Sequence, residues 1–265
     1  MDLGLKDRVA IIGGSSRGLG RAIAIAFAHE GANVAISART EADLRRTEIE
    51  LARAGSQQHV LAIPADLSVA RDIRRVVRDT FNRFGQIGIL VTHIGYGPPG
   101  RPSEFDDDTI MTTLEENFLS SVRFAREVIP YMKQQRWGRI VHLLPSLGHR
   151  LTDGKALTST SQLALMGYSK MLANELAPFN ITVNNLVSGP VETGFLTSSL
   201  ESQSQESGKH FDDLMRETIT GIPMGRLGKP EEIGDLVAFL ASNRASFMTG
   251  ASVVLDGGMR QQIIS

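Results

Sequence analysis

Apolar and polar positions alternate along the chain in two repeating patterns. Short runs of apolar, often β-branched residues are typical of strands covered on both faces, and longer segments with apolar residues every three or four positions are typical of amphipathic helices. The short runs predict strands at Val9–Gly13, Val34–Ala38, Val60–Pro64, Ile89–Thr92, Arg139–Leu144, Ile181–Val187 and Ser252–Leu255. The longer segments predict helices at Leu19–Glu30, Glu41–Ala54, Ala70–Phe84, Thr109–Gln134, Ser159–Pro178 and Glu231–Ala241.

This order of elements predicts one α/β domain over residues 1–265, a Rossmann fold. Strand–helix alternation implies right-handed crossovers and a doubly wound parallel sheet, here of about seven strands, with helices on both faces. No low-complexity linker divides the chain. The polar stretch Thr197–His210 is predicted to be a mobile excursion, and residues from about 194 to 220 to form a substrate lid.

Composition excludes several classes of function. The chain has no cysteine, which rules out disulfides, thiol catalysis and cysteine-ligated metals, and we expect no metal site. The formal net charge of -1 gives no electrostatic reason for binding nucleic acid or an anionic membrane. Charged residues precede the first apolar run, and no apolar stretch approaches the roughly 20 residues of a membrane span. We therefore expect a cytoplasmic protein with a small-molecule substrate.

A glycine-rich loop joins the first predicted strand to the first predicted helix. Glycines let the backbone approach a pyrophosphate closely, and a helix N-terminus offers free N–H groups and a positive dipole end. A tight turn alone would also need glycine, but the place of the loop between strand and helix favours a dinucleotide. The residues predicted to hold the pyrophosphate are Gly14, Ser16, Arg17, Gly18, Leu19 and Gly20.

The end of the second strand indicates which dinucleotide binds. Proteins that take NAD usually place an acid there to hold the ribose 2′-hydroxyl. Here Arg39 follows Ala38 and no acid is present. A guanidinium suits a 2′-phosphate through charge-assisted hydrogen bonds, and Arg17 offers a second cation. Both could instead be plain surface arginines. We predict NADP(H) as the cofactor, in preference to NAD(H).

Ordered motifs over residues 6–260 resemble the short-chain dehydrogenase/reductase family, and within it the 3-oxoacyl-carrier-protein reductases. The motifs are the glycine loop, Ala65-Asp66-Leu67, Glu116-Asn117-Phe118, Gly138–Val141, Asn180–Asn184, Gly189–Thr193, Gly225–Pro230 and Thr249–Gly258. The resemblance implies that Asp66 and Leu67 contact adenine. It implies further cofactor contacts from Gly95, Gln162, Gly189, Val191 and Thr193. It also implies a homodimer or homotetramer, built through the helices at 109–134 and 159–178 and the last strand.

The catalytic residues of that family do not match. Its Ser, Tyr and Lys positions fall on Pro145, Thr158 and Gln162. An aliphatic alcohol titrates far above pH 7 and is a poor proton donor. Gln162 can bind a ribose hydroxyl but brings no charge to depress a neighbour's pKa, and Pro145 has no hydroxyl or N–H to offer. The family's usual ketoreductase mechanism is therefore not expected.

Three classes of function stay open. The first, which we favour, is an oxidoreductase acting on a small carbonyl or alcohol with a different proton donor. The second is a non-redox enzyme for cyclisation, elimination or isomerisation that keeps NADP bound, and the third is a non-catalytic NADP(H)-binding or regulatory protein. Candidate catalytic residues are Asn117, Ser146, Thr158, Gln162, His149 and Tyr96. His149 and Tyr96 follow predicted strands, where open α/β sheets bind ligands.

Overall fold

Seven strands form one parallel sheet in the order β3-β2-β1-β4-β5-β6-β7. The computed structural model describes residues 1–54, 59–93, 95–145 and 154–260. The strands are β1 Val9–Gly13, β2 Asn33–Ala38, β3 Val60–Pro64, β4 Ile89–His93, β5 Gly138–Pro145, β6 Ile181–Ser188 and β7 Ser252–Leu255. The predicted seven-stranded doubly wound sheet is confirmed, with strand ends within about one residue of the predictions.

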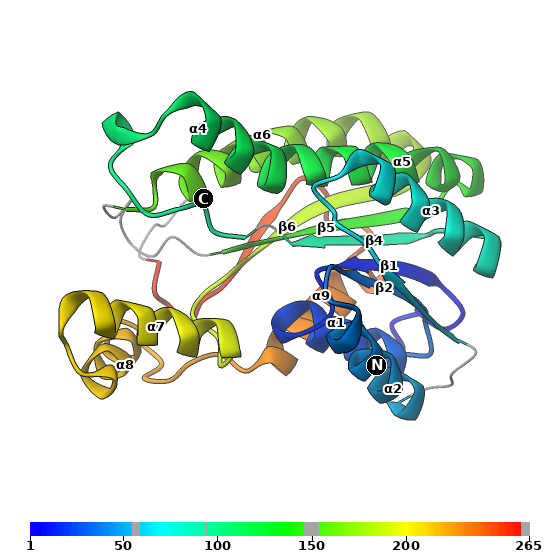
Figure 1. Cartoon of the computed structure of the whole chain (residues 1–265). Coiled ribbons are helices and arrows are strands. Elements are labelled where there is room, and N and C mark those ends of the chain that lie inside the picture. Colours follow the sequence, from blue (N-terminus) through cyan, green and yellow to red (C-terminus); the bar gives the residue numbers. More distant parts are fainter. Residues whose placement is uncertain (55–58, 94, 146–153, 261–265) are drawn as a thin grey trace.

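Helices cover both faces of the sheet (Figure 1). They are α1 Gly18–His29, α2 Glu41–Ala54, α3 Ala70–Phe84, α4 Asp107–Leu114, α5 Ser120–Gln135, α6 Ala156–Leu176, α7 Gly194–Ser207, α8 Phe211–Thr220 and α9 Pro230–Leu240. One apolar core lies between the sheet and α1, α2 and α9, and the other between the sheet and α3, α5 and α6. Every residue of β1, β5 and β6 is buried, because helices cover each of these strands on both sides. Among the described helices, none is both long and apolar enough to cross a membrane.

The position of the cleft follows from the strand order. The chain runs outward from β1 to β3 on one side, and then returns to place β4 on the other side of β1. At this switch point the segments that follow β1 and β4 leave the sheet in opposite directions, which opens a crevice at the carboxyl ends of the strands. Gly13 and His93, the last residues of these two strands, therefore stand at the edge of the crevice.

The helix predicted at 109–134 is helical throughout but not regular. A π-helical turn at Glu115–Leu119 separates α4 from α5. Such a turn inserts one residue into the α-helical pattern and is frequent at functional sites. Asn117 lies within it and is 5% exposed. The irregularity thus turns a polar side chain toward the interior, beside the end of β4.

Most of the polar stretch Thr197–His210, predicted as a mobile excursion, lies in the helix α7, and α8 begins just after it. Thr193 caps α7 by accepting a hydrogen bond from the Leu196 N–H, and Gly208 ends it in a left-handed conformation at φ +73°. Lys209 forms an ion pair with Glu217 of α8 at 2.8 Å. Polar side chains are compatible with this helix because it exposes most of its surface, and Leu200 is its one buried residue. The two helices project beyond the sheet in Figure 1.

Candidate functional site

The glycine loop crosses over itself where α1 begins. A Cβ atom on Gly20 would lie 2.3 Å from the carbonyl oxygen of Gly14, so no other residue fits there. Gly14 and Gly18 have backbone φ values of +69° and +58°, which residues with a side chain rarely adopt. Both residues present backbone to the cleft, and the free N–H groups of the first turn of α1 lie directly behind them.

Serine 15 fixes this loop to the neighbouring strand. Its Oγ accepts a hydrogen bond from the Ser37 N–H at 2.9 Å and donates one to the Ile12 carbonyl at 2.8 Å. The N–H groups of Gly14 and Ser15 both donate to the Ser37 carbonyl. The loop is therefore held by hydrogen bonds that leave its outer face free for a ligand.

The side chains predicted to bind the adenosine end lie beyond β2 and β3. Arg39 and Arg17 are exposed, and neither forms an ion pair with any residue in the described ranges. Asp66 accepts hydrogen bonds from the N–H and hydroxyl of Ser68, which lower the pKa of its carboxyl, and Arg39 lowers it further by its charge. Cationic groups thus stand free at this end of the cleft, with a carboxylate that stays ionised beside them.

Leucine 67 occupies space that a larger residue at position 13 would need. A Cβ atom on Gly13 would lie 2.9 Å from Cδ1 of Leu67. The glycine at the end of β1 and the leucine after β3 therefore fit one another across the sheet.

Asparagine 117 holds the backbone that follows β4. Its Oδ1 accepts a hydrogen bond from the Gly95 N–H at 2.8 Å, and its Nδ2 donates to the Thr113 carbonyl at 3.1 Å. With both ends of its amide engaged, Asn117 positions the loop that borders the cleft.

The three residues predicted to fall on the family's catalytic positions are all buried. Thr158 is 2% exposed, and its Oγ1 accepts a hydrogen bond from the Gly97 N–H at 2.9 Å. Gln162, one turn further along α6, is 1% exposed, and neither its Oε1 nor its Nε2 has a hydrogen-bond partner among the described residues. Pro145 ends β5 opposite Ser188 of β6. Thr158 is therefore engaged with the loop, whereas the amide of Gln162 is left without a partner.

The segment after β6 closes the other end of the cleft. Gly189 packs against Asp256, since a Cβ atom on it would lie 2.7 Å from Cα of that residue. Val191 forms a bridge with Gly228, and Thr193 begins α7. A Cβ atom on Gly18 would lie 3.9 Å from Cγ2 of Thr193, so this segment reaches the glycine loop. Residues predicted for the two ends of the dinucleotide thus border one cleft.

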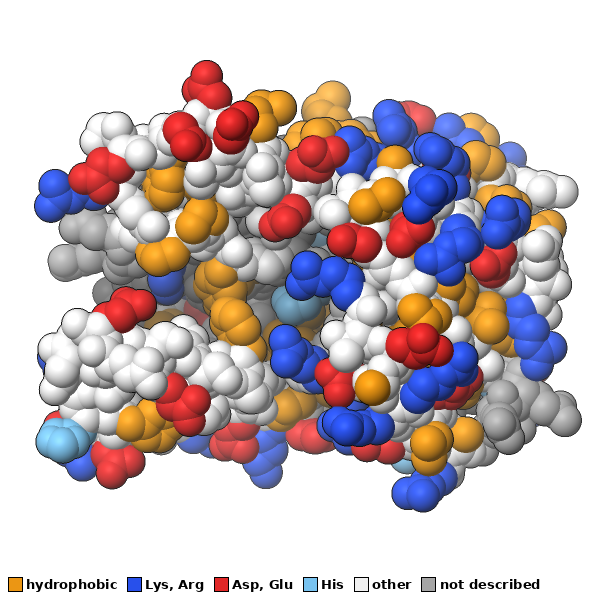
Figure 2. Space-filling model, in the orientation of Figure 1, with side chains coloured by type: hydrophobic (Ala, Val, Ile, Leu, Met, Phe, Trp, Pro, Cys, Tyr) orange, Lys and Arg blue, Asp and Glu red, His pale blue; other side chains and the backbone are white. Residues whose placement is uncertain are grey.

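An aromatic pair joins the two walls of this cleft. The rings of Tyr96, after β4, and Phe195, in α7, are stacked with centroids 5.2 Å apart and an interplanar angle of 8°. Tyr96 is 46% exposed and Phe195 60% exposed. Figure 2 shows the surface hollowed between the α7–α8 lobe and the helices above it. The Tyr96–Phe195 stack holds that lobe against the loop that follows β4.

The structure adds two titratable residues that the sequence argument left out. Lys155 immediately precedes α6, three residues before Thr158, and burial lowers its pKa. His93 is the last residue of β4, at the edge of the cleft, and it is exposed. The signal that could have found His93 is its place directly after the predicted strand Ile89–Thr92, where open α/β sheets bind ligands. Ser146 and His149, two of the predicted catalytic residues, lie outside the described residues.

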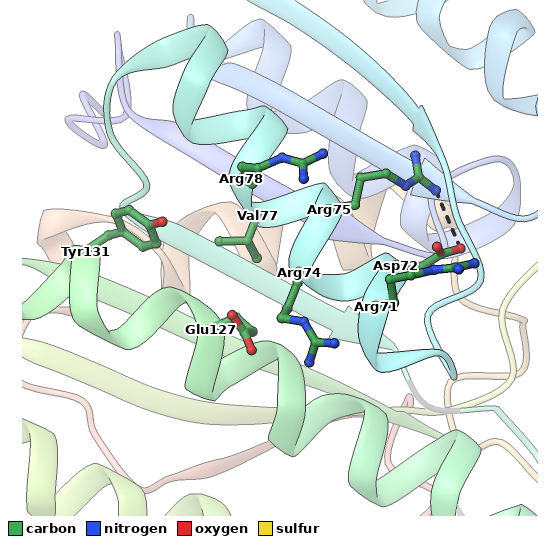
Figure 3. A pocket seen from close by; sticks show the side chains of 8 residues that line it. All are labelled: Arg71, Asp72, Arg74, Arg75, Val77, Arg78, Glu127 and Tyr131. Atoms are coloured by element: carbon green, nitrogen blue, oxygen red, sulfur yellow. Dashed lines mark ion pairs between the residues drawn. The ribbon is translucent and has the colours of Figure 1, made fainter.

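A second hollow, away from the cleft, runs between α3 and α5. Its volume is about 850 Å³, and Figure 3 shows charged side chains along it. They are Arg71, Asp72, Arg74, Arg75, Arg78 and Glu127. Because ligand pockets are mostly apolar, this groove lacks the character of a substrate pocket. In the described part of the chain, no group of three or more His, Asp or Glu side chains is placed to hold a metal.

Comparisons with known proteins agree with this geometry. Residues 14–260 match the family model described as enoyl-(acyl carrier protein) reductase. The chain is 32% identical to a 3-oxoacyl-[acyl-carrier-protein] reductase of Aquifex aeolicus, over 98% of this chain and 100% of the relative. It is 31% identical to an uncharacterised oxidoreductase of Bacillus subtilis, over 97% and 100%. Among solved structures, L-sorbose reductase of Gluconobacter frateurii with NADPH and L-sorbose superimposes with a TM-score of 0.93, at 29% identity over 99% and 100% of the two chains.

Proposed function

This chain belongs to the short-chain dehydrogenase/reductase family, and we propose that it is an NADP(H)-dependent oxidoreductase acting on a small carbonyl or alcohol substrate. The observation that carries the proposal is the cleft at the switch point, where the crossed glycine loop meets the segment that begins α7. The relatives named above are reductases and an oxidoreductase, and the matching solved structure holds NADPH.

The residues along the cleft fit a dinucleotide. A backbone cradle that only glycine permits stands at the N-terminus of α1, as a pyrophosphate requires. The buried amide of Gln162 lacks a partner, and a ribose hydroxyl would supply one. The proposed contacts are Gly14, Ser16, Arg17, Gly18, Leu19 and Gly20 for the pyrophosphate, Arg39, Asp66 and Leu67 for the adenosine end, and Gly95, Gln162, Gly189, Val191 and Thr193 for the nicotinamide end.

We propose NADP(H) in preference to NAD(H) because of Arg39. Its guanidinium is exposed directly after β2 and is not neutralised by an ion pair within the described ranges. A 2′-phosphate dianion offers it the bidentate, charge-assisted geometry that arginine favours. Arg17, in the glycine loop, adds a second cation on the same side.

The chain has to provide the proton for carbonyl reduction. When bound, a reduced nicotinamide supplies a hydride to the carbonyl carbon, and the oxygen then needs a proton. The Thr158 hydroxyl is buried against Gly97, and Gln162 has no acidic proton at neutral pH. We propose Lys155 as the donor, because it immediately precedes α6, the helix that carries Thr158 and Gln162, and burial lowers its pKa.

Transfer of isotope from the cofactor tests the redox proposal directly. The purified protein is incubated with a panel of ketoses, cyclic ketones and 3-oxoacyl thioesters. Each incubation contains NADPH that is deuterated on one face of C4, and the two faces are tested in turn. The products are analysed by mass spectrometry. We expect deuterium at the alcohol carbon of at least one product, from one face only. Tight NADPH binding without any transfer would contradict the redox proposal. It would favour instead a non-redox enzyme or a binding protein, for which the engaged hydroxyl of Thr158 is the structural argument.

We also propose a homodimer or homotetramer built on α5 and α6. Leu163 and Met171 of α6 are 60% and 69% exposed, and Gly167, between them, has nothing within 4 Å of where a Cβ would lie. Residues four apart share one face of a helix, so the three make an apolar strip open to a partner. A second copy of the chain would cover this strip.

A further inference from the structure

Histidine 93 lies beside the glycine loop, at the point where phosphate groups of a dinucleotide would pass. It ends β4, which pairs with β1 at the switch point of the sheet. A Cβ atom on Gly14 would lie 3.8 Å from both Cβ and Nδ1 of His93. The imidazole forms no hydrogen bond with the residues that the structure describes, and the side chain is exposed to the cleft.

The surroundings of His93 hold it neutral in the free protein. Desolvation by the surrounding protein atoms lowers the pKa of the ring to about 4. The charged or titratable groups on the elements around it are Arg17, Arg39, Asp66, Tyr96, Arg123 and His142. His142 belongs to the other face of the sheet, where its Nδ1 lies 2.7 Å from the Thr92 hydroxyl. Burial is the cause of the shift at His93, and the carboxylate of Asp66 does not offset it.

We propose that His93 is a phosphate-facing residue of the dinucleotide site and takes up a proton when NADP(H) binds. This inference rests on the proposed function, because it requires the dinucleotide to occupy the cleft. The bound phosphates bring negative charge next to a ring whose two nitrogens have no partner among the described residues, and both of which donate once the ring is protonated. An imidazolium there would add a charge-assisted hydrogen bond to those of the backbone N–H groups.

The coupling has a definite sign. A neighbouring anion favours the charged form of histidine, so the pKa of His93 is higher in the complex than in the free protein. Between these two values the complex holds one proton more than its components, and binding strengthens as the pH falls. For the shift that a close opposite charge typically causes, the contribution of His93 to NADP⁺ affinity grows by about tenfold from pH 7 to pH 5. The 2′-phosphate of the ligand also titrates near pH 6 and must be separated from this effect.

Histidine-selective NMR and calorimetry test the proposal without any assay of turnover. The chain has six histidines, and His93→Asn identifies the signal of His93 by its loss. The His93 ring is titrated in the free protein and at saturating NADP⁺. Binding enthalpies in two buffers of different ionisation enthalpy then give the number of protons taken up at pH 5.5, for the unmodified protein and for His93→Asn. The 2′-phosphate contributes equally to both proteins, so the difference belongs to His93.

We expect the pKa of His93 to rise on binding, and the variant to take up fewer protons. An unchanged His93 titration at saturating NADP⁺ overturns the inference while leaving the cofactor proposal intact. Equal proton uptake by the two proteins overturns it as well. Failure of NADP⁺ to bind at all would instead overturn the proposed function. His93→Gln serves as the second variant if His93→Asn does not fold, and the titration of the unmodified protein needs neither.

Discussion

The hydroxyl of Thr158 accepts a hydrogen bond from the backbone N–H of Gly97 at 2.9 Å, and so ties the first turn of α6 to the loop that follows β4. The two residues are 61 positions apart in the chain. At the position predicted for the family's acidic phenol, the Thr158 hydroxyl acts as an acceptor that shapes the wall of the cleft.

Removing this hydroxyl should destabilise the protein. Thr158→Val keeps the shape of the side chain but leaves the Gly97 N–H without its partner, which should cost about 1–3 kcal/mol in the free energy of unfolding. Urea unfolding measures the loss. The matched control is Thr160→Val, whose exposed hydroxyl only donates to the Ala156 carbonyl of its own helix. Equal effects of the two substitutions would show that the Thr158–Gly97 bond adds nothing specific.

Restoring the family's catalytic residues should raise ordinary ketoreductase activity. We expect the unmodified protein to reduce 3-oxoacyl thioesters very slowly, and Pro145→Ser, Thr158→Tyr and Gln162→Lys together to accelerate this by about 10²–10⁴-fold. The single changes should do little, because members of a catalytic unit act together. Thr158→Tyr alone should also unfold more easily, since it must displace Gly97. Turnover by the unmodified protein near the enzyme median of about ten per second would contradict the prediction.

Replacement of Lys155 should remove the proton donor. Lys155→Gln should lower kcat for reduction of the native substrate by about 10²–10⁴-fold. Burial lowers the pKa of Lys155, so reduction by the unmodified protein should slow as the pH rises through that value, where the ammonium is lost. Profiles of kcat against pH check both points, and the variant should lack this decline. Lys170→Gln, an exposed lysine of α6 bonded to the Gly250 carbonyl, is the control. An unchanged profile in Lys155→Gln would assign the proton to another group, with Tyr96→Phe the next variant to assay.

Reversing the charge at position 39 should separate the two nicotinamide cofactors. Arg39→Asp should weaken NADPH binding by about 10–100-fold and leave NADH binding nearly unchanged, because only NADPH carries the 2′-phosphate. Titration calorimetry measures both affinities. Arg46→Asp changes the charge by the same amount on α2, where the arginine is 78% exposed and paired with Asp43, and should alter neither. Tighter binding of NADH than NADPH by the unmodified protein would reverse the preference.

Charges on the apolar strip of α6 should break the assembly. We expect the unmodified protein to have the mass of a dimer or tetramer by light scattering at micromolar concentration. Leu163→Glu with Met171→Glu should yield monomers, because burying two carboxylates in an apolar contact is unfavourable. Ile49→Glu, on α2 at the opposite face of the sheet and 55% exposed, should leave the mass unchanged. A monomeric unmodified protein would contradict the proposal.

Local pattern in the sequence determined most of the architecture. The apolar runs of the strands and the three-to-four-residue spacing of the helices depend only on nearby residues, so they placed the seven strands and the main helices. The glycine loop could also be located, because its conformation depends on residues that are close in the sequence. Its glycines permit positive φ values and a close contact between Gly20 and Gly14. The hydrogen-bonded π-turn around Asn117 and the α7–α8 pair were not visible, because polar composition does not distinguish a capped, exposed helix from a loop.

Only the tertiary structure decided which distant residues meet. The sequence predicted that Thr158 takes the place of a tyrosine, but not that its hydroxyl is bonded to Gly97. It showed His93 and Tyr96 after a strand, but not that one lies beside Gly14 and the other stacks on Phe195. Such contacts join segments that are brought together by the packing of helices on both faces of the sheet. Their geometry depends on the shape of the whole core, which no local pattern encodes.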